Sequence, residues 1–314
     1  MPERTDYWGI PSNWRPDLIV YSVMFLAAII LLVRFYQQGR LWWQVGRSEK
    51  RWDKIQIRFG RLINYAIVQT RILSQRYPGL MHIGLAWGFF VFFLGTALAT
   101  IDSHFIKFLV GNPYLIYKFI LDIFTIFFLF GAVLAGYRRF IQKPSRLTLD
   151  TRFTLSLILI SLIVLAGLTI ESLRLAIVQP AWALWSPVGW LVAQIWIASG
   201  ATQQTLLIIH EGTWLFHLLL AGFTVAILPV GTLWHTLTGP VNIFFSEIDR
   251  PTGQLKPVAE TAKNEPIYVK SLSDLTWKQL MEGNACTECG RCQDVCPAYA
   301  AGTPLSPKQF VLSI

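Results

Sequence analysis

Five long apolar runs, separated by polar segments, dominate the pattern of the chain. They cover Leu18–Tyr36, Gly79–Ile101, Tyr114–Gly136, Phe153–Val178 and Thr205–Val230. Each run is long enough to cross the roughly 30 Å hydrocarbon core of a bilayer as an α-helix. The pattern therefore predicts an all-α membrane protein built on a five-helix transmembrane bundle.

A sixth apolar stretch, Ala181–Ser199, differs from these five runs. It contains Pro187, Gln194 and four tryptophans. Ser186 followed by Pro187 is typical of a helix start, with the proline at the first helical position. Tryptophan collects at the membrane–water interface. We therefore expect a short helix that lies in the interface, and not a sixth span.

Positive charge is concentrated in two of the segments between the runs. Residues 37–78 contain nine Lys and Arg and residues 137–152 contain five, whereas residues 102–113 and 171–204 contain one each. Basic loops stay in the cytoplasm. We therefore expect a multi-pass protein of the inner (cytoplasmic) cell membrane, with its N-terminus outside and its C-terminus in the cytoplasm. The polar start, residues 1–15, predicts no cleavable signal peptide.

Composition agrees with a membrane protein that has a small soluble part. Hydrophobic residues make up 54% of the 314 residues and charged residues only 14%, whereas soluble domains carry about 25% charge. The net charge of +9 lies in loops next to apolar runs, so membrane lipid explains it and no nucleic-acid partner is expected.

The chain becomes polar after the last apolar run, which predicts three regions. Residues 1–245 form the membrane domain, and residues 246–270 read as a linker because they are rich in Pro, Gly and charge. Residues 271–314 form a small α-helical segment. A short helix is expected at Ser273–Glu282, with Ser273 as its N-cap.

All four cysteines of the chain lie in this last segment. Cys286, Cys289, Cys292 and Cys296, followed by Pro297, have the spacing of a bacterial 4Fe–4S ferredoxin loop. Zinc sites pair their cysteines across a longer spacer, and disulfides need an oxidising compartment. We therefore expect an iron–sulfur cluster on the cytoplasmic side. In two-cluster ferredoxins the fourth cysteine of such a run binds the other cluster, so a further ligand is expected from elsewhere.

The five histidines are candidate haem ligands. A histidine inside a membrane helix is costly and therefore functional by default, and b-type haem takes two imidazoles from facing helices. His82 and His235 lie at the cytoplasmic ends of the second and fifth runs. The matching depth predicts that they share an inner haem.

An outer haem is the second expectation. His217 precedes His235 by 18 residues, about 27 Å along one continuous helix and on the same side of it. His104, 22 residues past His82, is the candidate partner. The chain is thus expected to bind one or two haems b.

Polar residues near the outer ends of the runs suggest a quinone site. Glu171 and Arg174 are three residues apart on one helix face and form either an interfacial ion pair or a quinone-linked proton site, with His210 as a further candidate. Lys118 and Asp122, four residues apart in the third run, are expected to pair with each other.

Several motifs resemble a known family. They are Pro78-Gly-Leu-Met-His82, Tyr137-Arg-Arg139, Glu171-Ser-Leu-Arg174, the stretch from His217 through His235 to Phe245, Cys286 to Ala298, and Pro304-Leu-Ser-Pro307. The chain resembles membrane-bound iron–sulfur oxidoreductases related to heterodisulfide reductase, of the bacterial electron-transfer-flavoprotein:quinone oxidoreductase type. The membrane part is similar to the cytochrome b (gamma) subunit of respiratory nitrate reductase.

The resemblance implies an enzyme, a quinone-linked oxidoreductase. It would transfer electrons between a soluble cytoplasmic donor, such as an electron-transfer flavoprotein, and membrane quinone through a 4Fe–4S cluster and haem b. The chain departs from the pattern of this family in two respects. Position 92 is Phe where the nitrate reductase cytochrome has a second histidine. The family also continues with a second cysteine run and CCG-type domains, so a C-terminal extension or a partner subunit is expected.

Two alternatives to an oxidoreductase remain at this stage. Either the chain is a non-catalytic anchor and electron relay subunit of a larger complex, or it is a transporter-like bundle whose histidines relay protons.

Overall fold

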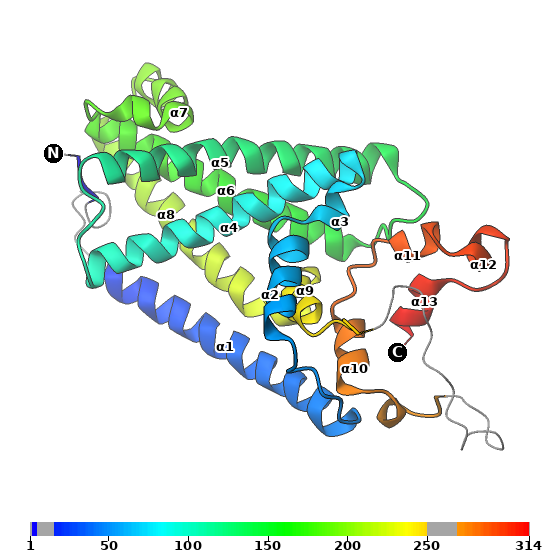
Figure 1. Ribbon diagram of the computed structural model, residues 1–314. Coiled ribbons are helices and arrows are strands. Elements are labelled where there is room, and N and C mark those ends of the chain that lie inside the picture. Colours follow the sequence, from blue (N-terminus) through cyan, green and yellow to red (C-terminus); the bar gives the residue numbers. More distant parts are fainter. Residues whose placement is uncertain (1, 5–15, 250–268, 314) are drawn as a thin grey trace, which may run out of the picture. The chain divides into compact units, whose positions relative to one another are not determined.

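The computed structural model describes residues 2–4, 16–249 and 269–313 (Figure 1). Within these ranges the chain forms helices and turns and no β-strand. Most of the predicted linker, and residues 5–15 of the polar start, lie outside the described residues.

Five helices are long and apolar enough to cross a membrane, as the apolar runs predict. They are α1 (Pro16–Val45), α4 (Arg76–His104), α5 (Asn112–Tyr137), α6 (Thr151–Val178) and α8 (Gln203–Ile227). A π-helical turn, Arg138–Gln142, continues α5. The described chain is therefore that of an all-α membrane protein.

The sixth apolar stretch forms the short helix α7 (Pro187–Ala198). Its 12 residues extend about 18 Å, which is too short to cross a bilayer. Helix α7 begins at Ser186 and Pro187 as predicted, but the Ser186 side chain does not cap it. The cap comes from α5, where the Asp122 carboxylate accepts hydrogen bonds from the backbone N–H groups of Val188 and Gly189 (2.6 and 3.0 Å).

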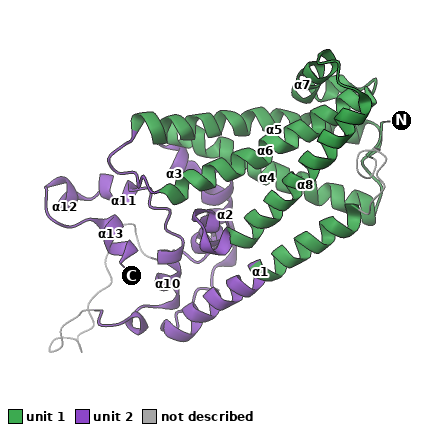
Figure 2. Cartoon of the chain, turned by 180° about the vertical axis from the view of Figure 1, so that it is seen from behind, with its two compact units in different colours: residues 1–30, 75–142, 151–227 green, residues 31–74, 143–150, 228–314 purple. Residues whose placement is uncertain are grey.

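The described chain divides into two compact units (Figure 2). Unit 1 comprises residues 1–30, 75–142 and 151–227, and unit 2 comprises residues 31–74, 143–150 and 228–314. Unit 1 thus holds the first half of α1 together with α4, α5, α6, α7 and α8. Unit 2 holds the second half of α1, the connections from α1 to α4 and from α5 to α6, and the chain from residue 228 onward.

Glycines allow the closest helix contact in unit 1. A Cβ at Gly84 of α4 would lie 2.8 Å from the Phe127 carbonyl oxygen, and one at Gly131 of α5 would lie 2.9 Å from the Met81 carbonyl oxygen. Only glycine permits the two backbones to approach so closely. Helices α4 and α5 therefore form a tight antiparallel pair.

Apart from the second half of α1, the helices of unit 2 are short. They are α2 (Ile55–Leu62), α3 (Thr70–Leu73), α9 (His235–Phe244), α10 (Trp277–Asn284), α11 (Arg291–Asp294), α12 (Pro297–Ala300) and α13 (Pro307–Leu312). Trp42, Trp277 and Met281 form a buried cluster that anchors α10 on the end of α1.

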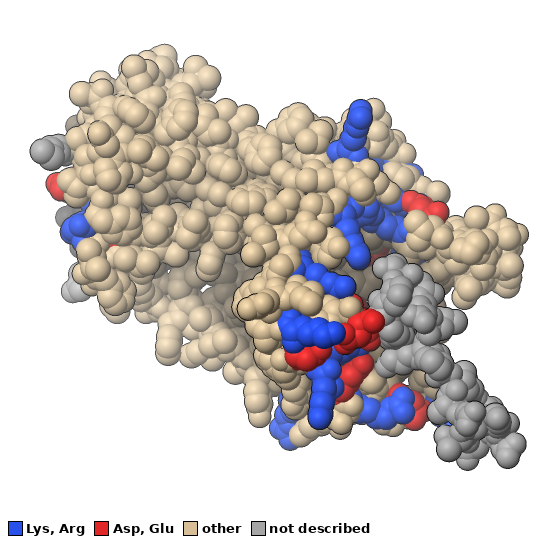
Figure 3. Space-filling model, in the orientation of Figure 1, with Lys and Arg blue, Asp and Glu red and all other residues tan. Residues whose placement is uncertain are grey.

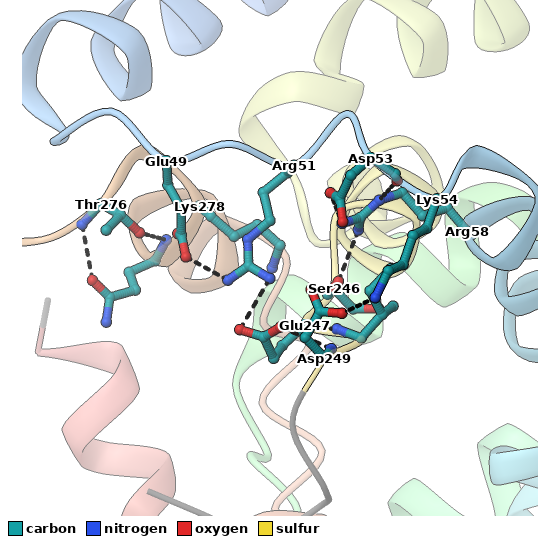
Figure 4. A network of polar contacts seen from close by, with 12 residues as sticks. Glu49, Arg51, Asp53, Lys54, Arg58, Ser246, Glu247, Asp249, Thr276 and Lys278 are labelled. Atoms are coloured by element: carbon teal, nitrogen blue, oxygen red, sulfur yellow. Dashed lines mark hydrogen bonds and ion pairs between the residues drawn. The ribbon is translucent and has the colours of Figure 1, made fainter. Parts of the chain in front are cut away.

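A polar network around Arg58 joins segments of unit 2 that are distant in sequence (Figure 4). The Arg58 side chain is 1% exposed and donates to the carbonyl oxygens of Asp53, Phe244 and Ser246 (2.8, 3.0 and 2.9 Å). It also pairs with the Asp53 carboxylate at 2.8 Å, which holds the pKa of Asp53 below its ordinary value. Arg58 therefore fixes the end of α9 to the segment before α2.

The fifth span does not continue as one helix to His235, contrary to the expectation. Helix α8 ends at Ile227, and two 3₁₀ turns, Leu228–Val230 and Thr232–Trp234, precede α9. Pro229 lacks a backbone N–H and Gly231 adopts an extended conformation, which explains the break. The argument that His217 and His235 share one helix face is therefore wrong.

The helix predicted at Ser273–Glu282 begins later. Ser273 lies inside a 3₁₀ turn, Leu272–Asp274, whose N-cap is Ser271. Thr276 caps α10 and exchanges hydrogen bonds with Gln279 in a capping box. The chain thus has two successive capping boxes, Ser271 with Asp274 and Thr276 with Gln279, and the second one starts α10.

Charged side chains are unevenly distributed on the face shown in Figure 3. Lys and Arg gather with Asp and Glu over the loops of unit 2, whereas wide areas over α4 and α5 carry none on this face. This separation fits an apolar bundle with charged connecting loops.

Candidate functional site

The cysteine loop connects α10 to α12 in unit 2. Glu288 and Gly290 have left-handed backbone conformations (φ 55° and 70°), and these turn the chain sharply between Cys286 and Cys292. Cys286 is half-buried, Cys289 and Cys292 are exposed, and no described cysteine forms a disulfide. The loop therefore presents free thiols on its accessible side.

The first three cysteines influence one another. Burial raises the pKa of the Cys286 thiol, nearby Cys289 and Cys292 raise it further, and the backbone N–H of Glu288 opposes them by bonding to the sulfur. A thiol in this setting gains from a cation at the sulfur, since a bound metal deprotonates it. The donor set and the inward backbone N–H fit an iron–sulfur cluster.

No group of three His, Cys, Asp or Glu among the described residues converges on a single metal ion. The sulfur ligands of a 4Fe–4S cubane bind different irons and need not converge on one point.

The cysteine loop rests on both basic loops that connect the membrane helices. Arg291 donates to the Arg71 carbonyl oxygen (2.7 Å) and to Ser74 (3.3 Å) in the first loop. Arg146 in the second loop pairs with Asp294. A Cβ at Gly290 would collide with the Arg146 carbonyl oxygen, so the two backbones touch there. Unit 2 thus brings the cysteines and both basic loops together.

Two of the candidate haem ligands are oriented by backbone carbonyls. The Nδ1 of His235 lies 2.8 Å from the Thr232 carbonyl oxygen, and the Nδ1 of His217 lies 3.0 Å from that of Ile163. Because a carbonyl only accepts, each Nδ1 carries the proton and each Nε2 keeps a lone pair, as in metal-bound histidines. Burial lowers the pKa of His235, which favours the neutral form that a metal needs.

The structure does not bring His104 and His217 together. His104 is the last residue of α4 and bonds the Tyr21 hydroxyl. His217 lies 14 residues inside α8, about 21 Å from its first residue. The end of α4 leads directly into the start of α5, where Tyr114 contacts Trp182 just after α6. Leu206 at the start of α8 packs in one cluster with residues from the end of α6. The end of α4 and the start of α8 therefore lie at the same end of unit 1. The two imidazoles therefore differ by about 20 Å in depth.

The depth of His217 corresponds to Phe92 on α4. Phe92 is 12 residues before the end of α4, about 18 Å, and its ring packs on Phe128 at 6.1 Å. The structure thus separates His104 from His217, and the outer haem stays a prediction without an assigned second ligand. The inner pair, His82 on α4 and His235 on α9, belongs to two different units and stays a prediction.

A buried charge cluster forms at the α7 end of unit 1. The Glu171 carboxylate pairs with Lys118 at 2.6 Å and with Arg174 at 3.0 Å. Arg174 also donates to the Tyr114 hydroxyl (3.3 Å). His210, 4% exposed, is close enough to Glu171 and Arg174 to interact with them electrostatically. The three predicted quinone-site residues thus lie near one another.

Sequence reasoning missed the partners of Lys118 and Asp122. Lys118 and Asp122 do not pair as expected. Lys118 reaches Glu171 on α6, and Asp122 caps α7. Their i,i+4 spacing is compatible with a pair, and only the packing of α5 against α6 and α7 shows the stronger partners.

Comparison with known proteins supports the class that these sites suggest. The chain is 30% identical, over 98% of its length, to an EtfAB:quinone oxidoreductase of Syntrophomonas wolfei. It is 26% identical, over 95% of its length, to a probable iron–sulfur-binding oxidoreductase FadF of Bacillus subtilis. A probable membrane-anchored ferredoxin of Chromohalobacter salexigens is 36% identical over 32% of the chain. Over most of its length the chain therefore resembles membrane-associated iron–sulfur oxidoreductases, the type that its motifs suggest.

The chain spans 44% and 43% of the first two relatives' lengths. No family model matches the chain, and no solved structure matches it.

Proposed function

We propose that this protein transfers electrons between a soluble cytoplasmic donor and membrane quinone. Cys286, Cys289 and Cys292 would hold a 4Fe–4S cluster whose fourth ligand comes from elsewhere. Cys296 would also bind iron, as the fourth cysteine of such a run does in ferredoxins. His82 and His235 would hold one haem b. When bound, both groups supply reversible one-electron transfer. The protein would lie in the inner cell membrane with its cysteines in the cytoplasm.

The observation that supports this proposal is the contact of the cysteine loop with both basic loops. Arg291 and Arg146 tie the loop to the segments that connect the membrane helices. A cofactor held there is fixed to both basic loops of unit 2, whereas the cofactor of a freely tethered ferredoxin is not. The name of the Syntrophomonas relative includes EtfAB and quinone, which supports an electron-transfer flavoprotein as donor and quinone as acceptor.

Glu171, Arg174 and His210 are the proposed quinone-site residues. They lie at the end of unit 1 that carries α7, where Ser186 and Gly189 contact Glu171. A quinone ring needs hydrogen-bonding groups next to an apolar surface. The buried charge cluster provides such groups at membrane depth, where polar side chains are functional by default.

Spectroscopy of the purified, cofactor-replete chain tests the cofactors. We expect a b-type α band in the reduced-minus-oxidised spectrum and an electron paramagnetic resonance signal of a reduced cubane. His235→Ala should remove the haem band, whereas His104→Ala, the matched control, should leave it unchanged. Absence of a b-type band in the wild-type protein, or its survival in His235→Ala, contradicts the haem assignment.

Quinol oxidation separates enzyme from relay subunit. In the proposed enzyme, a short-chain quinol reduces the bound haem of this chain alone. If the haem is present and quinol reduces it only after a partner subunit is added, the chain is the anchor and relay subunit.

A further inference from the structure

An open cavity of about 550 Å³ lies at the α7 end of unit 1. Its lining residues are Pro2, Pro180, Ala181, Trp182, Leu184 and Trp185. The volume lies within the range of about 300–1,000 Å³ found for small-molecule sites, which are mostly apolar with a few convergent polar groups. The apolar lining alone does not identify an occupant.

Trp182 connects this cavity to the buried charge cluster. The Arg174 guanidinium lies over the Trp182 ring, 5.1 Å from its centroid. The Tyr114 ring meets the same indole edge-on, with centroids 5.2 Å apart. Arg174 and Tyr114 are 4% and 2% exposed, so they lie behind the indole and away from water. One aromatic ring therefore separates an open apolar cavity from Tyr114, Arg174, Glu171 and Lys118.

The rim of the cavity carries exposed apolar side chains. Leu184 is 74% exposed and Trp185 is 43% exposed, and both precede α7. Exposed Trp and Leu at the end of a membrane bundle are typical of the lipid interface. A ligand that reaches the cavity through lipid would meet these side chains first.

We propose that this cavity receives the ring of a membrane quinone, which docks against Trp182. The inference rests on the proposed function and names the place and the positioning residue. A quinone is a flat ring with two carbonyl oxygens and an apolar tail. The indole offers a flat face for the ring, Arg174 and Tyr114 hold the indole in place, and the rim at Leu184 and Trp185 accommodates the tail.

Photolabelling tests the place directly. The full chain, in phosphatidylcholine nanodiscs with its cofactors, is irradiated with an azidoquinone and digested for mass spectrometry. We expect the label on residues 180–185, and we expect an excess of unlabelled quinone to displace it. Label confined to other segments, or label that quinone does not displace, overturns the proposal.

Substitutions test the role of Trp182. Trp182→Ala should raise the KM for quinol about tenfold, with a smaller change in kcat, because one aromatic stacking contact is lost. Trp182→Phe keeps a flat ring and should raise KM about threefold or less. Trp190→Phe, a partly buried tryptophan of α7 outside the lining, is the matched control. An equal KM in Trp182→Ala and Trp190→Phe refutes the positioning role.

The outcomes distinguish the two proposals. If quinol reduces the bound haem and the label lies elsewhere, the function stands and this site is wrong. If quinol reduces nothing and no label is displaced, both are wrong. If Trp182→Ala does not fold, the wild-type labelling decides.

Discussion

Replacing Asp122 with alanine should release the first turn of α7 from the bundle. Asp122 is 6% exposed, and its two oxygens accept the backbone N–H groups of Val188 and Gly189 at 2.6 and 3.0 Å. The first N–H groups of a helix have no partner within the helix. Without Asp122 these two would be left unpaired in an apolar setting.

The size of the effect follows from the two bonds. A hydrogen bond to a charged group contributes about 1.5–3 kcal/mol, so two bonds contribute at least about 3 kcal/mol. Every 1.4 kcal/mol changes an equilibrium about tenfold. Local opening of the first turn of α7 should therefore become more than about a hundredfold more frequent.

Hydrogen exchange followed by mass spectrometry measures this opening over residues 186–198. Asp122→Asn keeps one acceptor oxygen and should give an intermediate rate. Asp102→Ala is the matched control, because the Asp102 carboxylate accepts from Phe108 and Leu109 (2.8 and 2.7 Å) in another loop at the same end. Unchanged exchange over α7 in Asp122→Ala, or equal acceleration by Asp102→Ala, would refute the capping role.

Three further predictions concern unit 2. Arg58→Met should lower the free energy of unfolding by about 3 kcal/mol because it leaves buried carbonyls without a donor. Lys54→Met, which removes an exposed pair with Asp249, should leave thermal unfolding unchanged, and an equal effect of both contradicts this reasoning. Gly290→Ala should reduce the iron content after gel filtration, because its Cβ would collide with the Arg146 carbonyl, whereas Gly283→Ala, with open space around it, should not. Backbone N–H groups of Lys270 and Ser271 hold the pKa of Asp274 below its ordinary value. The turn 270–275 should therefore be stable above about pH 4 and loosen as the pH falls through the lowered pKa. Hydrogen exchange checks this, and Asp274→Asn should abolish the pH dependence.

The long helices were predictable because their signal is local. Five apolar runs of sufficient length each give one helix, and α7 is short because its run is interrupted by Pro187. The break between α8 and α9 also has a local cause in Pro229 and Gly231. Because the helix does not continue straight from His217 to His235, the 18-residue spacing does not put the two histidines on one face.

The partners of buried charges were not predictable from spacing. Lys118 and Asp122 satisfy the i,i+4 rule, but that rule gives only about 0.2–0.5 kcal/mol per pair. A carboxylate at 2.6 Å on a packed neighbour, as Glu171 is for Lys118, outweighs it. Which helices pack together depends on contacts such as Gly84 with Phe127, and these are distant in sequence.

The length of α7 shows where packing decides what hydropathy leaves open. Residues 181–199 are apolar, but Asp122 binds the start of α7, and its 12 residues extend only about 18 Å. Helix α7 therefore adds no sixth candidate span to the five long helices of the described chain. In unit 2, the contacts of Arg291 with Arg71 and of Arg146 with Asp294 hold the cysteine loop against both basic loops. The two findings come from different units and different interactions, and each stands without the other.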